Sequence, residues 1–252
     1  MSVRSQDGKL KLLGRRQFAR LLEAGMNESN PPTNYLAVIG DMRGSRSAPR
    51  RAELQKLMER GLVRINEEFG ERLGAGFVIT LGDEFQGLLR KPEEAVRVLV
   101  ALDSVFGGDI PIRYGLGWGA ISTELRELAV GMDGPCFHNA REAVERGKRA
   151  DRWATVSGFG EDDEVLNGLL WLVGAVRGRR TDVQRETVEQ VRAARTQREA
   201  AAARGVHESS VSQALKAALH EPVLAAEHSV EILLGRYGDR IQRGGETGEV
   251  AR

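Results

Sequence analysis

The stretch FVITLGDEFQGLL, residues 77–89, decides the fold of the central part of the chain. Apolar residues alternate at strand period before Gly82 and resume at Phe85. Gly82 lets the backbone turn sharply between the two halves. We therefore predict a β-hairpin that carries two adjacent carboxylates, Asp83 and Glu84, at its tip.

A third carboxylate, Asp41, ends another apolar run, residues 35–40, which predicts a buried strand. If the two strands are neighbours in one sheet, Asp41 and Asp83 converge, with Glu84 beside them. Such carboxylates suit Mg²⁺ or Mn²⁺ that holds a nucleotide phosphate. The backbone around them could bind the phosphate itself, and the predicted nucleotide-binding residues are Met42, Arg43, Gly44, Ser45 and Gly82.

Composition is typical of a globular protein, because 41% of the 252 residues are hydrophobic and 29% are charged. The sequence contains no apolar run of membrane-spanning length and no apolar core of a signal peptide. A single cysteine, Cys136, excludes an intrachain disulfide. We expect a cytoplasmic protein without a membrane partner.

The net charge of +1 hides two basic segments. Residues 1–20 contain six Lys or Arg and one acid, and residues 177–204 contain eight Arg and four acids. Both could contact polyanions, or they could be solvated faces, and we favour the second interpretation for residues 1–20.

The order of predicted elements defines the fold class. Periodicity predicts strand, helix, hairpin, helix, strand, helix and strand, in the ranges 35–40, 48–73, 76–90, 91–106, 111–123, 136–148 and 155–159. This order is typical of an α/β sandwich (α+β class) of the split βαβ, ferredoxin-like type, with a mainly antiparallel sheet.

Glycines at alternate positions interrupt the strand PIRYGLGWGAIST, residues 111–123. Gly115, Gly117 and Gly119 leave one face of this strand without side chains. Two explanations are open, namely the close approach of a ligand or a tightly packed helix.

Beyond residue 160 the pattern is helical, and residues 196–219 predict a helix-turn-helix. Residues 196–199 have capping-box spacing, and Gly205 makes the turn before a second helix. We expect Ala201 at the helix crossing and Val206 and Val211 in a small core. An ordinary helical hairpin is the alternative to a DNA-binding unit. The predicted DNA-binding residues are Arg198, Arg204, Ser209, Ser210, Ser212, Gln213 and Lys216.

The sequence thus divides into four parts. Residues 1–33 form a flexible basic extension, residues 34–160 a nucleotide-binding domain, residues 161–239 a small all-α domain, and residues 240–252 a disordered tail.

The runs IGDMRGS, ITLGDEFQGLL, RYGLGWGAI and GMDGPCFHNAREA, in this order, resemble the SatD family of bacterial proteins. More distantly they resemble the palm domain of class III nucleotidyl cyclases and the diguanylate cyclase fold with its Gly-Asp-Glu-Phe signature. The resemblance implies that Asp41 and Asp83 hold two Mg²⁺ ions that activate a ribose 3′-hydroxyl and neutralise a triphosphate. It also implies that Arg141 stabilises the transition state.

One part of the cyclase pattern is missing. The asparagine expected four residues before Arg141 is replaced by Phe137, and His138 and Asn139 are out of step with it. Whether the chain is an enzyme therefore stays open.

Our leading hypothesis is a DNA-binding transcriptional regulator with a Mg²⁺-dependent, cyclase-like nucleotide-binding domain. The alternative is a nucleotidyl cyclase or related nucleotidyltransferase with a helical regulatory domain, and a third possibility is a scaffold in which neither site functions. We expect a homodimer, because cyclase-type domains and helix-turn-helix proteins both tend to pair.

Overall fold

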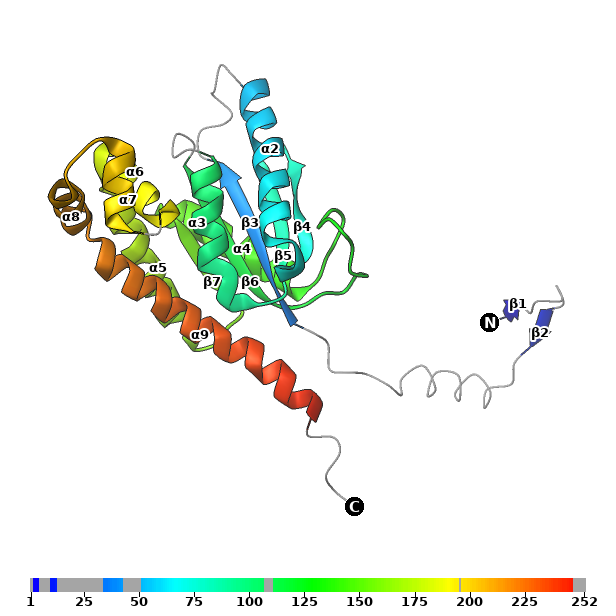
Figure 1. Ribbon diagram of the computed structural model, residues 1–252. Coiled ribbons are helices and arrows are strands. Elements are labelled where there is room, and N and C mark those ends of the chain that lie inside the picture. Colours follow the sequence, from blue (N-terminus) through cyan, green and yellow to red (C-terminus); the bar gives the residue numbers. More distant parts are fainter. Residues whose placement is uncertain are drawn as a thin grey trace.

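The computed structural model describes residues 2–4, 10–12, 34–42, 51–106, 111–194 and 196–246. A five-stranded sheet has the strand order β4-β5-β3-β6-β7 (Figure 1). Its strands are β3 (Asn34–Met42), β4 (Leu73–Leu81), β5 (Glu84–Leu89), β6 (Ile112–Ala120) and β7 (Ala154–Ser157). All neighbours are antiparallel except β6 and β7. The predicted mixed α/β class, with a mainly antiparallel sheet, is confirmed.

Helices cover both faces of this sheet. Along the sheet domain these are α2 (Arg51–Phe69), α3 (Ala95–Val105) and α4 (Pro135–Ala150), with short 3₁₀ turns η2 (Gly70–Arg72) and η3 (Pro92–Glu94). The C-terminal part contains α5 (Asp162–Gly178), α6 (Asp182–Ala193), α7 (Gln197–Arg204), α8 (Glu208–Ala217) and α9 (His220–Glu246).

Alternate residues of β3 face two different layers, as the strand period requires. Leu36, Val38 and Met42 are buried in the main core with α2 and α3. Ala37 and Ile39 are buried on the other face, in a second core with α4. Asp41 has the same parity as Ala37 and Ile39, so its side chain lies on the α4 side of the sheet.

The glycines of β6 admit α4 against the sheet. A Cβ atom on Gly117 would lie 2.0 Å from the carbonyl oxygen of Cys136 and 2.1 Å from the backbone nitrogen of Ala140. A Cβ atom on Gly115 would lie 2.2 Å from the carbonyl oxygen of Ala140. Of the two explanations for the glycine pattern, the structure therefore selects a tightly packed helix.

The C-terminal helices divide between two cores. Leu166 and Leu170 of α5 and Val230 and Leu234 of α9 join the main core of the sheet domain. A separate three-helix core is built from α6, α7 and α8, and it contains Val188, Ala201, Val211, Leu215 and Ala218. Only α6–α8 thus form a unit with its own core, whereas the range 161–239 treats all five helices as one domain.

The structure describes only part of each end of the chain. A short antiparallel pair, β1 (Ser2–Arg4) and β2 (Leu10–Leu12), lies within the predicted extension 1–33, and the rest of that range is outside the described residues. Helix α9 continues to Glu246, into the range predicted as a disordered tail. Once packing has formed a helix, each added residue gains a backbone hydrogen bond, so the polar sequence continues it.

Among the described residues, no helix is both long enough and apolar enough to span a bilayer.

Candidate functional site

The predicted acidic residues meet where β3 ends beside the β4–β5 hairpin. Asp41 is the direct cross-strand partner of Glu84. The backbone N–H of Met42 donates to the carbonyl oxygen of Asp83 at 3.1 Å. Gly82 has a φ of 65°, the left-handed conformation that the tight turn requires. Three residues predicted from separate stretches therefore come together at one end of the sheet.

Basic side chains of α4 bond to two of these carboxylates. Lys148 Nζ lies 2.9 Å from Asp41 Oδ1, and it also pairs with Glu145 at 2.8 Å. Arg141 binds both oxygens of Glu84, and its Nη2 lies 2.5 Å from Oε1. Arg141 and Lys148 are seven residues apart, two helical turns, so they lie on one face of α4. We call these five residues the α4 charge cluster.

The hydroxyl of Thr80 completes the contacts of Glu84. It donates to Glu84 Oε1 at 3.2 Å. Only 11% of the Glu84 side chain and 15% of the Asp41 side chain are exposed, whereas 46% of Arg141 and 30% of Lys148 are exposed. The acids thus form the floor of the cluster and the bases form its rim.

The pKa shifts in the cluster favour its charged forms. The hydrogen bond to Glu84 raises the pKa of Arg141. The hydrogen bond from Lys148 lowers the pKa of Glu145. Burial lowers the pKa of Lys148, but hydrogen bonds and charges from Glu145 and Asp41 outweigh burial and raise it overall.

The α4 charge cluster suits a metal ion only when the ion binds together with a phosphate ligand. Asp41 and Glu84 supply the one or two carboxylates by which Mg²⁺ is usually held together with phosphate oxygens. Both carboxylates are bonded to protein cations, and the described residues contain no group of three or more His, Cys, Asp or Glu side chains that could hold an ion. The donor set therefore suits an ion that arrives with a phosphate, not a protein-only metal site.

Part of the predicted nucleotide-binding set has other positions. The side chain of Met42 is buried in the main core, and its N–H is bonded to Asp83, so Met42 does not face a phosphate. The contact between the end of β3 and the hairpin uses that N–H, so it is not available to a ligand. Gly82 is exposed in the hairpin turn, and Arg43, Gly44 and Ser45 lie outside the described residues.

The residues beside Arg141 have structural partners. The amide of Asn139 donates to the carbonyl oxygen of Trp118 at 2.8 Å. His138 is exposed and lies 2.9 Å from Asp133. Arg141 itself points at Glu84. The sequence predicted Arg141 but missed Lys148 and Glu145, although their spacing along the helix was the available signal.

A helix pair with a tight turn is present where the helix-turn-helix was predicted. The Thr196 hydroxyl accepts from the Glu199 N–H at 3.1 Å at the start of α7, and Gly205 ends it with a φ of 63°. Ala201 and Val211 are buried in the three-helix core as predicted. Val206 is 42% exposed, so its assignment to the core was wrong; the core of the unit includes Val188 of α6 instead.

The predicted DNA-contacting residues divide into two groups. The side chains on α8 and Arg198 on α7 are exposed, and the α8 residues are Ser209, Ser210, Ser212, Gln213 and Lys216. Arg204 instead turns inward, where it donates to the hydroxyl of Thr187 and lies 3.6 Å from Glu186 on α6. The prediction that Arg204 lies ready for phosphates was wrong, because an ion pair within the unit holds it.

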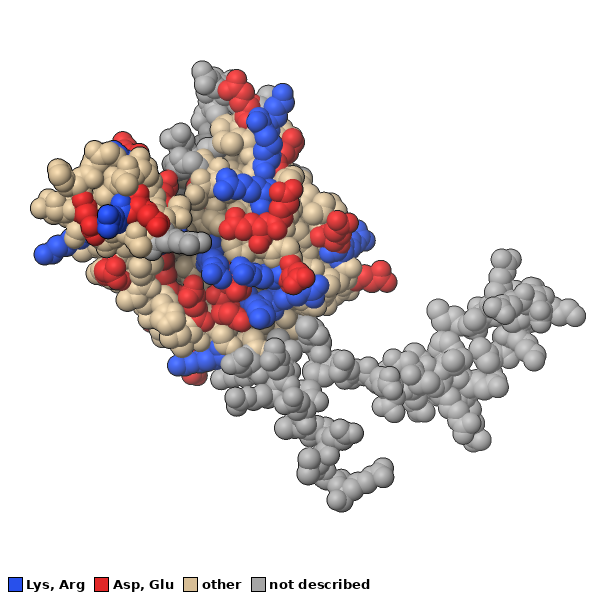
Figure 2. All heavy atoms as spheres, in the orientation of Figure 1, with Lys and Arg blue, Asp and Glu red and all other residues tan. Residues whose placement is uncertain are grey.

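Most arginines of the basic segment 177–204 are likewise held by internal partners. Arg185 bonds to Asp182 and to the carbonyl oxygen of Arg180. Blue and red spheres lie side by side on the lobe at the left of Figure 2, and this face shows no continuous basic stripe. The helical unit is therefore much less cationic towards a ligand than its sequence suggests.

A partly buried ion-pair network links α5 to the sheet domain. Asp103 on α3 accepts from Tyr114 Oη at 2.9 Å, Trp153 Nε1 at 3.0 Å and Arg177 Nη2 at 2.7 Å. The Arg177 guanidinium also stacks over the Trp153 ring, 4.5 Å from its centroid. Burial raises the pKa of Asp103, although Arg177 and these hydrogen bonds oppose the shift.

The same network continues to α6 and α9. Glu227 on α9 lies 3.5 Å from Arg177 and 2.7 Å from Arg192 on α6. Arg180 is buried nearby and donates to the carbonyl oxygen of Ala218 at 3.0 Å. Burial and the charges of Arg177 and Arg192 lower the pKa of Arg180 to about 10. We call Asp103, Arg177, Arg192 and Glu227 the α5 ion-pair network, which sequence analysis missed entirely.

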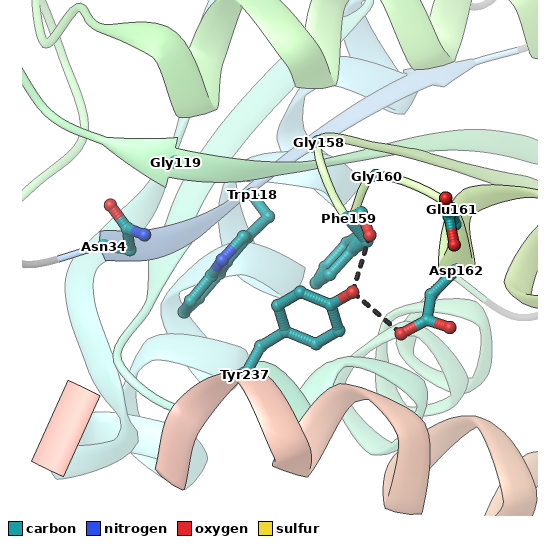
Figure 3. Close-up of a pocket in the computed structure, with 9 residues that line it drawn as sticks. All are labelled: Asn34, Trp118, Gly119, Gly158, Phe159, Gly160, Glu161, Asp162 and Tyr237. Atoms are coloured by element: carbon teal, nitrogen blue, oxygen red, sulfur yellow. Dashed lines mark hydrogen bonds between the residues drawn. The ribbon is translucent and has the colours of Figure 1, made fainter. Parts of the chain in front are cut away.

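A pocket of ≈ 690 Å³ lies at the other end of β3 from Asp41. The rings of Trp118, Phe159 and Tyr237 gather beside it, and the Tyr237 hydroxyl donates to Phe159 O at 2.6 Å and Asp162 Oδ2 at 2.8 Å (Figure 3). The lining includes two acids and no basic residue. It therefore offers no positive side chain to a nucleotide phosphate.

Of the comparisons with known proteins, one identifies a family and none identifies a function. A family model described as the SatD family matches residues 35–223. No curated protein matches. A bacterial light-regulated adenylyl cyclase shares 11% identity and a TM-score of 0.36, over 55% of this chain and 52% of its own. A regulator of polyketide synthase expression from Bifidobacterium adolescentis shares 16% identity and a TM-score of 0.27, over 88% and 87%. The chain thus spans about half of the first neighbour.

Proposed function

Because the chain belongs to the SatD family, we propose that it is a cytoplasmic DNA-binding transcriptional regulator whose sheet domain binds a nucleotide with Mg²⁺. The observation that carries the proposal is the arrangement of α8, which is packed by its apolar side on α6 and α7 and exposed along a polar face. A second helix with its polar face outward is the element that such motifs insert into a major groove.

Hydrogen-bonding side chains dominate the α8 face. Ser209, Ser210, Ser212 and Gln213 can read base edges, and Lys216 with Arg198 can contact phosphates. Arg198 and Lys216 are exposed, whereas Arg204 supports α6. Each protomer then offers about two phosphate contacts. Its affinity for DNA therefore depends on contacts to base edges or on two protomers that bind together.

Nucleotide binding is assigned to the α4 charge cluster together with the neighbouring Asp83. Asp41, Asp83 and Glu84 would hold the Mg²⁺ ion, which supplies positive charge to the phosphates. Arg141 and Lys148 are partly exposed on the same helix face and carry their charges at neutral pH. They can pair with phosphate oxygens instead of with Glu84 and Asp41. The cluster can therefore exchange internal ion pairs for ligand contacts.

A nucleotide can change DNA affinity only through a difference in its affinity for two arrangements of the protein. A chain of contacts connects the α4 charge cluster with the helical unit. Strand β7, against which α4 packs, leads directly into α5, and the α5 ion-pair network joins α3, α5, α6 and α9.

The DNA proposal is tested by the salt dependence of duplex binding. With two phosphate contacts per protomer and two protomers, log Kd against log salt concentration should have a slope of about 3 to 4. Lys216→Ala and Arg198→Ala should each lower that slope by about 1 to 2 in a dimer. Fluorescence anisotropy with pooled genomic fragments measures both.

Two variants serve as controls for this measurement. Lys56→Ala removes an exposed lysine on α2 and should leave binding unchanged. Arg204→Ala should lower thermal stability rather than the salt slope. Absence of any binding at low salt would eliminate the DNA proposal.

The nucleotide proposal and its enzymatic alternative are separated by one pair of experiments. Calorimetry with each nucleoside triphosphate and Mg²⁺ should detect binding that Asp41→Asn and Asp83→Asn each weaken at least about tenfold. Chromatography of the same mixtures detects turnover. Binding without products supports the regulator, and cyclic or condensed products lost in these variants support a nucleotidyl cyclase or nucleotidyltransferase.

The position of Arg141 beside the acidic residues is the observation that keeps the enzymatic alternative. Asp133→Asn, on the loop before α4, is the matched control because the Asp133 side chain contacts His138 and the Gly134 N–H, outside the cluster. Failure to bind any nucleotide would leave only the DNA part of the proposal.

A further inference from the structure

One face of α5 is apolar and exposed over its whole length. Val165 is 53% exposed, Trp171 is 56% exposed and Leu172 is 58% exposed. They belong to a stripe with helical spacing, and every residue of this stripe is exposed, namely Glu161, Glu164, Val165, Gly168, Trp171, Leu172, Ala175 and Arg179. We call it the α5 outer face. The opposite side of the helix packs into the main core through Leu166 and Leu170.

The middle of the α5 outer face combines an open backbone at Gly168 with the Trp171 ring, over which the Arg152 guanidinium stacks 5.1 Å from the ring centroid. A Cβ atom built on Gly168 would meet nothing within 4 Å, so the backbone there is open to an approaching partner. Ala175, two turns later, is also small and exposed. Large apolar side chains beside small ones let a second helix pack closely, with Trp171 and Leu172 as the hydrophobic contact.

The two ends of the face carry opposite charges. Glu161 and Glu164 lie at the start of α5, and Arg179 lies at its end. Within the described part of the chain, Glu164 and Arg179 have no ion-pair partner, whereas Arg177 and Arg180 at the same end turn inward. A partner that fits this surface presents an apolar centre that accommodates the Arg152 guanidinium over Trp171, a positive end opposite Glu164 and a negative end opposite Arg179.

A second copy of the same helix meets this description. We propose that the chain forms a homodimer in which two α5 helices pack antiparallel about a twofold axis between Trp171 and Leu172. Glu164 then faces the partner's Arg179, and Gly168 faces the partner's Ala175, because the members of each pair are equally far from the axis. A surface that complements itself under a twofold rotation is the requirement for a closed dimer.

The size of the face sets the expected strength. Helix α5 is about 25 Å long, so one helix pair buries less than the roughly 800 Å² per partner of a standard stable interface. We expect a dissociation constant in the micromolar range. This inference deepens only the dimeric part of the proposed function, and oligomeric state is measured without DNA or nucleotide, so the two can fail separately.

Charge exchange tests the arrangement. In sedimentation equilibrium of the full chain from about 1 to about 100 µM, Glu164→Arg and Arg179→Glu should each weaken dimerisation at least about tenfold, since each places two like-charge pairs across the axis. The double variant restores both pairs and should dimerise as the wild type does. An equimolar mixture of the two single variants should form heterodimers for the same reason.

The mixture tests whether the single variants are folded, because the same two preparations that fail to self-associate must then associate with each other. Glu67→Arg and Arg64→Glu, on exposed positions of α2, are matched controls and should not alter the dimer. A monomeric wild type at the highest concentration overturns the proposal, as does a dimer that ignores both single variants. Protection of Trp171 from a quencher in a monomer would show that another part of the chain covers the face, and would also overturn it.

Discussion

The α4 charge cluster and the α5 ion-pair network contain the same kinds of side chain in different surroundings. Arg141 is 46% exposed in the cluster, whereas Arg177 is only 19% exposed in the network. Exposed ions can exchange protein partners for water or a ligand at low cost, but buried ions that lose a partner cannot. The cluster is therefore suited to binding, and the network to holding α5, α6 and α9 in place.

The largest effect should come from the network. Arg177→Ala takes the guanidinium from Asp103, whose side chain is 23% exposed, and from Glu227, of which only 7% is exposed. We expect a loss of about 3 kcal/mol in the free energy of unfolding, measured by urea denaturation. Arg97→Ala removes an exposed arginine that pairs with Glu94 and should cost about 0.5 kcal/mol or less. Equal losses in the two variants would contradict the distinction.

A smaller effect should follow in the cluster. Arg141→Ala breaks an ion pair whose arginine is half exposed, and the 11% exposed Glu84 keeps its bond from Thr80, so we expect a loss of about 1 to 2 kcal/mol. Nucleotide affinity, in contrast, should fall at least about tenfold if Arg141 serves the phosphates. Arg149→Ala, exposed at the end of α4, is the comparison for both measurements. A large loss of stability without a change in affinity would make the cluster structural.

The smallest effect is a pH dependence within the network region. Burial, together with Arg192 and Arg180, lowers the pKa of His220 below its ordinary 6.5, and Glu221 and Glu227 oppose the shift. A lowered pKa means that the folded state favours neutral His220. Its contribution to stability is therefore present above pH 6.5 and is lost as the pH falls through the folded-state pKa.

The variant His220→Gln should remove this part of the pH dependence. The difference in unfolding free energy between wild type and variant should fall below pH 6.5, by at most about 1.4 kcal/mol for each pH unit. His228→Gln, exposed on the same helix, is the comparison variant. Parallel curves for wild type and His220→Gln would show that His220 does not titrate differently in the two states.

Local sequence signals predicted the turns and helix ends that neighbouring residues fix. Gly82 marked the hairpin turn, and Thr196 and Gly205 marked the two ends of α7, because capping and positive φ depend on a few adjacent residues. The prediction for Val206 failed, and the core of the unit includes Val188 of α6, which lies outside the helix pair that was recognised.

The ion-pair partners could not be predicted in the same way. Lys148 meets Asp41 across 107 positions of the chain, and Arg177 meets Asp103 across 74. Nothing in the neighbouring residues distinguishes these two from the exposed Arg198. The glycines of β6 show the same limit, because their pattern allowed either a ligand or a helix until α4 was placed against them.

The sequence by itself determined the hairpin, the buried strand β3, the ends of α7 and the acidic residues that gather at one end of the sheet. These follow from backbone geometry and from side-chain periods that operate over a few residues. Only the tertiary structure decided which cations neutralise those acids, which arginines turn inward and which face of α5 stays exposed. Ion pairing and burial depend on side chains brought together from distant parts of the chain, and packing alone fixes those meetings.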